Sequence, residues 1–415
     1  MVSYSRAAGL HADYNGAMSP TSSTPATARS HILLALTALA VGGFAIGTTE
    51  FGAMAVLPEM AAGTGVTIPQ GGHYFSAYAL GVVVGAPLLA VAFARTPRKA
   101  LLIGLMLAFA LGNLASAFSQ SQGQLLVARF IAGLPHGAYF GVGSLMGASL
   151  VRPNQRAKAV AFMMFGLNIA TLIGVPVSAF LGRQFGWQAV FAFVAVLGVL
   201  TALLLAILLP HSEPNRNAHP LNELKVLKNK AVVVALVTGA VGGCGLFSAF
   251  SYIVPTLTHE SGMPNEWIPY VLGLFGVGQI VGNLTAAHFA DRYLLPTIKA
   301  CLVWSTLVLT AFGLGVGNLW FAMVLVFLVG TMVALATPLQ IRLMDVAGDA
   351  QTLAAAGNHA SFNFANAAGA WLGGLVLAWG WGYPATGWVG AACALLALAF
   401  FLSMRQQPVP HRIPE

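Results

Sequence analysis

Long apolar runs, each of about 20 residues or more, recur along this chain from His31 to Met404. As α-helix, a run of that length crosses a hydrocarbon core of roughly 30 Å. Within lipid, only helices and closed barrels satisfy all of their backbone hydrogen bonds. Charged residues make up only 7% of the 415 residues, against roughly 25% in a soluble domain. The sequence therefore predicts an all-α membrane protein.

Breaks at proline, glycine and charged residues divide the chain into twelve predicted transmembrane helices. They cover residues 31–57, 72–93, 99–118, 124–150, 158–182, 187–209, 231–257, 267–290, 297–317, 319–341, 352–378 and 384–404. The longest polar stretch between spans, Pro210 to Lys230, separates the sixth from the seventh. We expect a disordered cytoplasmic tail over 1–30, in which Met18 is an alternative start, and a six-helix bundle over 31–209. A cytoplasmic linker over 210–230, a second bundle over 231–404 and a cytoplasmic tail over 405–415 follow.

The basic residues fall almost entirely at alternate loops and at the C-terminal tail, and Arg183 is the exception on the other side. Loops rich in Lys and Arg stay in the cytoplasm, so both termini are predicted to be cytoplasmic. The formal net charge of +8 then reflects orientation in a membrane and no affinity for nucleic acid. The basic residues concerned are Arg95, Arg98, Lys99, Arg152, Arg156, Lys158, Arg216, Lys225, Lys228, Lys230, Arg292, Lys299, Arg342, Arg405 and Arg412.

A weak internal repeat relates the two predicted halves. A shift of 197 positions aligns Pro58 with Pro255, Gly81 with Gly278, Gly85 with Gly282 and Arg95 with Arg292, and a shift of 195 aligns Asn168 with Asn363 and Gly174 with Gly369. Such duplication in a hydrophobic chain is typical of transporters, whose substrate site lies at the interface between the repeats near mid-membrane. The sequence therefore predicts two pseudo-symmetric six-helix bundles.

Several segments carry a resemblance to the major facilitator superfamily over nearly all of 31–404. Within it, the chain is similar to the drug:proton antiporter branch with twelve spans, and there to the arabinose-inducible efflux permeases and their relatives. The segments are Gly47–Phe51, Leu57–Glu59, Tyr78–Pro87, Ala128–Gly143, Ala336–Gln340 and Asn363–Gly374. The resemblance implies a major facilitator fold that works by alternating access.

Two further motifs bear on the direction and gating of transport that the resemblance implies. The fifth span carries Gly166, Gly174, Pro176 and Gly182, similar to the antiporter motif of exporters, although Val175 replaces the glycine of its Gly-Pro pair. The basic loop after the second span lacks its usual Gly and Asp and keeps Arg95 and Arg98, whereas the second half keeps Asp291 and Arg292. We expect these four residues to form the cytoplasmic gating loops, with the acidic contact in the second half.

Glu50 lies inside the first span, roughly 10 Å below its outer end at 1.5 Å per residue. Acids at such depth usually face a cavity or a partner and mark proton pathways, although a structural, hydrogen-bonded acid is the alternative. Arg129 lies at similar depth in the fourth span and is its expected counter-ion, and His136 follows two helical turns later on the same face. Glu50, Arg129 and His136 are thus the candidates for proton coupling, with helix packing as the alternative for His136.

Uncharged polar residues form stripes on several otherwise apolar spans. Such residues can join helices by hydrogen bonds, but stripes on several spans favour the wall of a hydrated substrate cavity. The glycines between Gly133 and Gly143 are interpreted instead as sites of close helix approach. The candidate cavity residues are Asn168, Ser248, Tyr252, Gln279, Asn283, His359, Asn363 and Asn366.

These features favour a secondary active transporter, with proton-coupled efflux of a small organic solute such as a sugar, a sugar derivative or a drug-like compound. Facilitated or proton-coupled uptake of a sugar-like solute is the alternative. An enzyme is disfavoured because no nucleophile, metal set or paired acid has useful spacing, and a channel because no filter segment repeats. We expect no cofactor or metal, since the three cysteines are far apart and no Gly-Lys-Ser/Thr phosphate loop occurs. We expect a monomer in the bacterial inner membrane whose partners are the solute, protons and lipid.

The predicted topology can be tested by cysteine labelling from either side of the membrane. Lys99, Lys158, Lys225 and Arg405 should each be reached from the cytoplasm when replaced by Cys, because the basic loops stay inside. Labelling at position 225 from the periplasm would contradict the arrangement in two halves.

Overall fold

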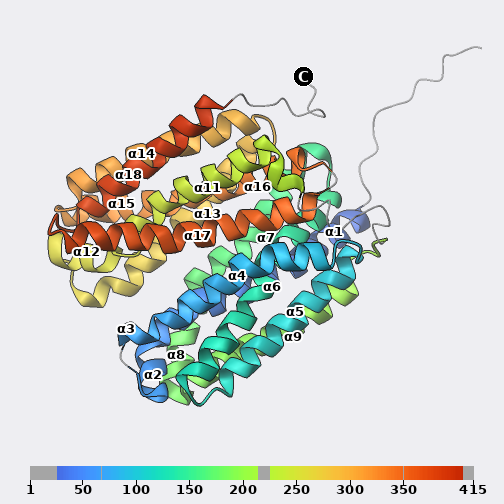
Figure 1. Ribbon diagram of the computed structural model, residues 1–415, viewed down its shortest axis with the longest axis horizontal. Helices are drawn as coiled ribbons and strands as arrows, with labels where there is room; N and C mark the ends of the chain where they lie inside the picture. Colours follow the sequence, from blue (N-terminus) through green and yellow to red (C-terminus); the bar gives the residue numbers. More distant parts are fainter. Residues whose placement is uncertain (1–25, 67, 214–224, 349, 405–415) are drawn as a thin grey trace, which may run out of the picture.

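The computed structural model describes residues 26–66, 68–213, 225–348 and 350–404. These residues form helices joined by short connections, and no strand occurs in this part of the chain. Figure 1 shows two helical groups side by side, one blue to green and one yellow to red. The predicted all-α fold with two six-helix bundles is confirmed.

The first bundle contains six spans, two of which are interrupted. The first span consists of α1 (Ala26–Phe51), the 3-10 turn η1 (Gly52–Val56) and α2 (Leu57–Thr64), and the short α3 (Ile68–Gly71) follows. The next three are α4 (His73–Ala92), α5 (Arg98–Ala117) and α6 (Gln122–Ser149). After the turn η2 (Pro153–Gln155), the fifth comprises α7 (Arg156–Ile169), the π-helical turn η3 (Ala170–Gly174) and α8 (Val175–Phe185), and the sixth is α9 (Trp187–Leu208).

The second bundle repeats this order. After the turn η4 (Val226–Lys228), its first span consists of α11 (Lys230–Phe250) and α12 (Ile253–Glu260), and η5 (Asn265–Trp267) leads into α13 (Ile268–Ala290). The remaining elements are α14 (Leu294–Gly315), α15 (Leu319–Thr331), η6 (Met332–Leu335), α16 (Ala336–Val346), α17 (Gln351–Ala378) and α18 (Ala385–Ser403).

Eleven helical segments in the described chain are long and apolar enough to cross a membrane. The twelfth, α17, has 28 residues and is therefore about 42 Å long, enough to cross. Its polar residues, among them His359, Asn363 and Asn366, reduce its mean hydropathy, which is why composition alone does not select it.

The structure corrects three details of the predicted boundaries. Helix α1 begins at Ala26, inside the predicted tail. The first span continues past residue 57 because Pro58 lies in the first turn of α2, where its missing N–H costs nothing. Arg342, predicted to be a loop residue, lies within α16 and is only 1% exposed. Met18, Arg216, Arg405, Arg412 and most of the tails and linker lie outside the described residues.

The helix ends define two faces. The basic face is the end formed by the connections α4–α5, α6–α7, α13–α14 and α16–α17, which carries Lys99, Lys158 and Arg292. The opposite face is the end formed by the connections α8–α9, α12–α13, α14–α15 and α17–α18. The two bundles meet where α17 packs on α4 and α6, and where α13 packs on α7. In Figure 1 the bundles separate toward α3 and α12, at the opposite face.

Two helix pairs at equivalent positions have backbones in direct contact. In the first bundle, a Cβ on Gly81 of α4 would lie 2.2 Å from the carbonyl oxygen of Phe130 in α6. In the second, a Cβ on Gly278 of α13 would lie 2.2 Å from the carbonyl oxygen of Phe327 in α15. Both partners are related by the same shift of 197, so the internal repeat of the sequence corresponds to a repeated packing contact.

Replacing Gly81 or Gly278 with Ala should destabilise the protein, because the added methyl group forces the two helices apart. Overpacking of this kind costs roughly 1–3 kcal/mol, which a lower Tm of the purified protein would report. Gly104→Ala in α5 is the matched control, since a Cβ there meets nothing within 4 Å. Equal Tm values for Gly81→Ala and Gly104→Ala would contradict the packing described.

Candidate functional site

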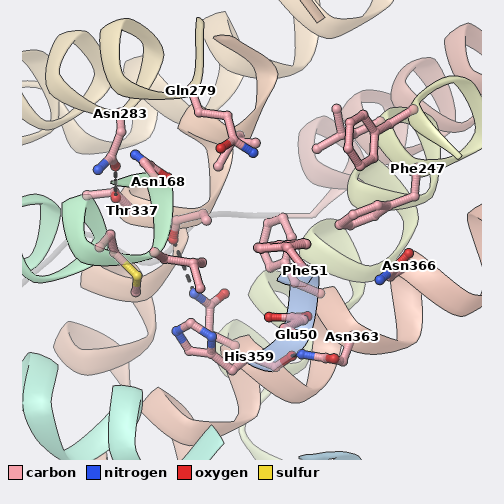
Figure 2. A pocket seen from close by; sticks show the side chains of 18 of the residues that line it. Glu50, Phe51, Asn168, Phe247, Gln279, Asn283, Thr337, His359, Asn363 and Asn366 are labelled. Atoms are coloured by element: carbon pink, nitrogen blue, oxygen red, sulfur yellow. Dashed lines mark hydrogen bonds between the residues drawn. The ribbon is translucent and has the colours of Figure 1, made fainter. Parts of the chain in front are cut away.

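A cavity of about 870 Å³ lies at the centre of the molecule, between the two bundles (Figure 2). Its lining comes from α1, α6 and α7 of the first bundle and from α11, α13, α16 and α17 of the second. The predicted cavity residues Asn168, Gln279, Asn283, His359, Asn363 and Asn366 all line it, as do Glu50 and His136.

Glu50 lies in the last turn of α1, directly before the helix changes to the 3-10 turn η1. It is the only acidic side chain that lines the cavity in the described chain. Its carboxyl group is half-buried and forms no ion pair with any described residue. A carboxylate at this depth is costly unless it faces water or a partner, and the cavity provides the water-accessible side.

Arg129 does not pair with Glu50 as expected. The guanidinium of this fully buried residue donates hydrogen bonds to the Oγ1 of Thr49 (2.8 Å) and to the Thr49 carbonyl oxygen (3.2 Å). It also lies over the rings of Tyr78, at 4.4 Å, and Phe191, at 5.1 Å, in cation–π contacts. Consecutive helical residues point about 100° apart, so Thr49 faces the interior of the first bundle while Glu50 faces the cavity.

The two histidines of the cavity meet across the bundle interface. His136 of α6 and His359 of α17 have ring centroids 5.7 Å apart, and His359 stacks on Phe140 at 4.3 Å. The hydroxyl of Tyr78 lies 3.1 Å from the Nδ1 of His136. Sequence reasoning assigned the histidines to separate roles and did not single out Tyr78, which contacts both Arg129 and His136. Its place at the start of the motif Tyr78–Pro87 is the signal that could have identified it.

The amide side chains of the cavity differ in how they are held. The Oδ1 of Asn283 accepts from Thr337 at 2.6 Å, and its Nδ2 donates to the carbonyl of Ala161 in the other bundle at 3.0 Å. Asn283 therefore joins the halves as well as lining the cavity. By contrast, the Nδ2 of Asn168 and the Oε1 of Gln279 are buried and have no hydrogen-bond partner among the described residues.

Ser248 and Tyr252 were predicted to line the cavity, and the structure contradicts this. The Ser248 hydroxyl donates to the carbonyl oxygens of Gly245 and Thr386, and the Tyr252 hydroxyl donates to that of Ala370 at 2.9 Å. Both side chains therefore join the first span of the second bundle to neighbouring helices of the same bundle. This is the alternative role of polar residues in a membrane.

A second cavity, of about 1090 Å³, lies between the bundles toward the opposite face. It shares Phe51, Phe247, Phe250 and Asn366 with the central cavity. Its other lining residues come from η1, from the outer parts of α4, α12, α13 and α17, and from Ser251 between α11 and α12. The second cavity is therefore adjacent to the central cavity, on the side of the opposite face.

The basic face, in contrast, is closed by contacts between the bundles. Asp345 of α16 forms an ion pair with Arg156 of α7 at 2.8 Å. The Oδ1 of Asp291, at the end of α13, accepts from the backbone N–H of Ala157 at 2.8 Å, so a carboxylate lies at the N-terminus of α7. Deeper in the interface, α6 and α17 touch, since a Cβ on Gly141 would lie 2.5 Å from the backbone nitrogen of Ala356.

The predicted gating residues are thus divided. Asp291 lies at the contact between the bundles, whereas Arg292 and Arg95 are exposed at the same face. Arg98 lines a separate polar cavity of about 1010 Å³ with Glu213 and Gln351. Arg156 and Asp345, which sequence reasoning did not single out as a pair, are 189 positions apart, and only the fold brings them together.

Comparisons with known proteins agree with this geometry. The family model described as Major Facilitator Superfamily matches residues 39–276 and 247–415. Inner membrane transport protein YdhP of Escherichia coli (strain K12) is 38% identical over 375 residues, which cover 90% of this chain and 96% of that protein. The protein AraJ of the same strain, which is named as a transporter, is 32% identical. The match covers 88% of this chain and 93% of AraJ. A "Probable sugar efflux transporter" of Pasteurella multocida is 28% identical over 88% and 90%.

Two solved structures share the fold. The human organic anion transporter MFSD10 has a TM-score of 0.69 at 17% identity, with 90% of this chain and 99% of that one covered. The E. coli fucose:proton symporter FucP has a TM-score of 0.69 at 13% identity, with 91% and 98% covered.

Asp345→Asn should weaken the closure of the basic face. Loss of about 1 kcal/mol would change the ratio of this conformation to the alternatives roughly fivefold. The measurement is the rate at which a charged thiol reagent, added from the opposite face, modifies Asn366→Cys in a background without other cysteines. The rate should fall in Asp345→Asn, because the cavity on the side of the opposite face, which Asn366 lines, closes when the basic face opens. Glu260→Gln, at an exposed acid on α12, is the control. An unchanged rate would show that the ion pair does not hold the closure.

Proposed function

This chain belongs to the Major Facilitator Superfamily, and we propose that it is a proton-coupled exporter of a small organic solute. Its relatives are transporters, and it is a multi-pass membrane transporter rather than an enzyme. For its setting we propose the bacterial inner membrane, with the basic face and both termini in the cytoplasm, as the distribution of Lys and Arg favours. The sugar efflux name of one relative supports the outward direction.

The observation that carries the proposal is the position of Glu50. A single acidic side chain, without an ion-pair partner among the described residues, faces the central cavity, which adjoins a second cavity on the side of the opposite face. In this conformation Glu50 takes a proton from the periplasm. After the bundles rock to open the basic face, it releases that proton to the cytoplasm, and the solute enters the cavity.

The proton gradient provides enough free energy for this exchange. Each proton that enters the cell down its gradient releases roughly 1.4 kcal/mol per pH unit and 2.3 kcal/mol per 100 mV. Antiport requires that the transporter bind the proton and the solute alternately and never both at once. Glu50 meets this requirement when its ionised form is the one that favours solute binding.

Arg129 and His136 support Glu50 in this proposal. Arg129 holds the carbonyl of Thr49, the residue before Glu50, and so fixes the end of α1. His136 contacts Tyr78 in its own bundle and His359 in the other. It therefore lies where the two bundles separate or meet during the cycle.

The test uses inside-out vesicles with a pH-sensitive dye in the lumen and a panel of sugars, nucleosides and drug-like compounds added outside. For a transported compound, the wild type should release protons from the lumen. Glu50→Gln should abolish this release and uphill transport, because it keeps the size of the side chain but cannot titrate. Downhill exchange should be partly retained.

Glu260→Gln, an exposed acid on the same protein, is the matched control and should behave as the wild type. Undiminished, proton-dependent transport by Glu50→Gln would remove Glu50 from the mechanism and assign the proton to His136. Protons that enter together with the solute would indicate symport, and with it the alternative of uptake.

A further inference from the structure

In the part of the chain that the structure describes, four buried polar atoms of the central cavity's lining residues have no hydrogen-bond partner. They are the Nδ2 of Asn168, the Oε1 of Gln279, the Oδ1 of Asn358 and the Nε2 of His359. All four residues line the cavity, and their exposures are 2%, 7%, 1% and 8%. A buried polar atom without a hydrogen bond is costly, so folded proteins rarely keep several in one place without a function.

The chemistry of these atoms indicates what would satisfy them. An amide nitrogen donates, the two amide oxygens accept, and an imidazole nitrogen can do either. A single ion cannot match such a mixture, whereas hydroxyl and amide groups donate and accept at once. The polar part of the ligand is therefore expected to carry several hydroxyl or amide groups.

The apolar part of the lining includes five phenylalanines. Phe51, Phe247, Phe250, Phe275 and Phe362 line the cavity, and the rings of Phe250 and Phe275 stack at 4.1 Å. Figure 2 shows Asn168, Gln279 and Asn283 grouped on one side, with Phe247 across from them. Three of the phenylalanines, Phe51, Phe247 and Phe250, continue into the cavity toward the opposite face. A ligand that spans both regions needs an apolar or aromatic part.

The charges near the cavity exclude a strongly charged ligand. Glu50 is the only carboxylate among the described lining residues, and Arg129, though buried in the first bundle, is near enough to interact with it electrostatically. While Glu50 is ionised, the two opposite charges leave no net charge to hold a cation or an anion.

We infer that the central cavity binds an uncharged, amphipathic solute with a hydroxyl- or amide-bearing end at Asn168, Gln279, Asn358 and His359 and an aromatic or branched apolar end at Phe51 and Phe247. An aryl glycoside has this chemistry. The inference rests on the proposed function only in treating this cavity as the transport site.

The test is a binding titration on the full-length protein in lipid nanodiscs, at one pH and without a gradient. The probes are 4-nitrophenyl glycosides of three hexoses, methyl glucoside, 4-nitroanisole, and 4-nitrobenzylamine as its ammonium ion. At least one aryl glycoside should bind roughly tenfold more tightly than the three other probes, because only it fills both regions. Equal or tighter binding of methyl glucoside or of the cation would overturn the inference. Failure of every glycoside to bind the folded protein would also overturn it.

Two variants test which lining residues contact the polar end and the apolar end of the ligand. Gln279→Leu should weaken the aryl glycoside roughly tenfold and leave 4-nitroanisole unchanged, since only the glycoside has hydroxyls to pair. Phe247→Ala should weaken 4-nitroanisole and the aryl glycoside but not methyl glucoside. Each variant retains one ligand, which shows that it is folded.

Gln188→Leu and Phe180→Ala, both at exposed positions away from the cavity, are the matched controls. Equal losses for the glycoside and 4-nitroanisole in Gln279→Leu would contradict the division of the site. Because no proton flux is measured, this outcome is independent of the Glu50→Gln result, which tests the coupling alone.

Discussion

The contact on which this architecture depends is the direct approach of two helix backbones at equivalent places in the two bundles. Lipid provides no hydrophobic driving force between helices, so close packing must hold them together. Gly81 and Gly278 allow that packing at equivalent places. Tyr78 lies one turn before Gly81, and Gln279 follows Gly278 directly, so the same contacts fix the two helices that present site residues to the bundle interface.

Local patterns in the sequence predicted the parts of the fold that depend on lipid. Apolar runs predicted the spans, because the thickness of the bilayer sets the length of each run. The repeat predicted the two bundles, because it corresponds to a duplicated packing contact. Asn168 and Gln279, predicted as cavity residues, line the same cavity as Glu50, the predicted proton-coupling residue. A polar group inside a span has few options other than a cavity or another helix.

The failures arise where several helices decide the outcome together. The partner of Arg129 depends on which of two adjacent residues, Thr49 or Glu50, faces the bundle interior, and a span boundary known to a few residues cannot give that rotation. Ser248 shows a second ambiguity, since a hydroxyl group on a span can face either a cavity or the carbonyl oxygen of a neighbouring helix. The approach of His136 to His359 requires the relative placement of the two halves, which no local pattern contains.

The interruptions in the first span of each bundle have a mechanical consequence. α1 ends at Phe51 and α2 begins at Leu57, and in the second bundle α11 ends at Phe250 and α12 begins at Ile253. Both breaks occur beside the aromatic residues shared by the two cavities. Each outer piece is thus joined to its inner partner through a short turn, the 3-10 turn η1 in the first bundle and Ser251–Tyr252 in the second, rather than through continuous α-helix. The outer rim of the cavity can tilt around these joints while the inner rods, and the carboxyl group at the end of α1, keep their positions.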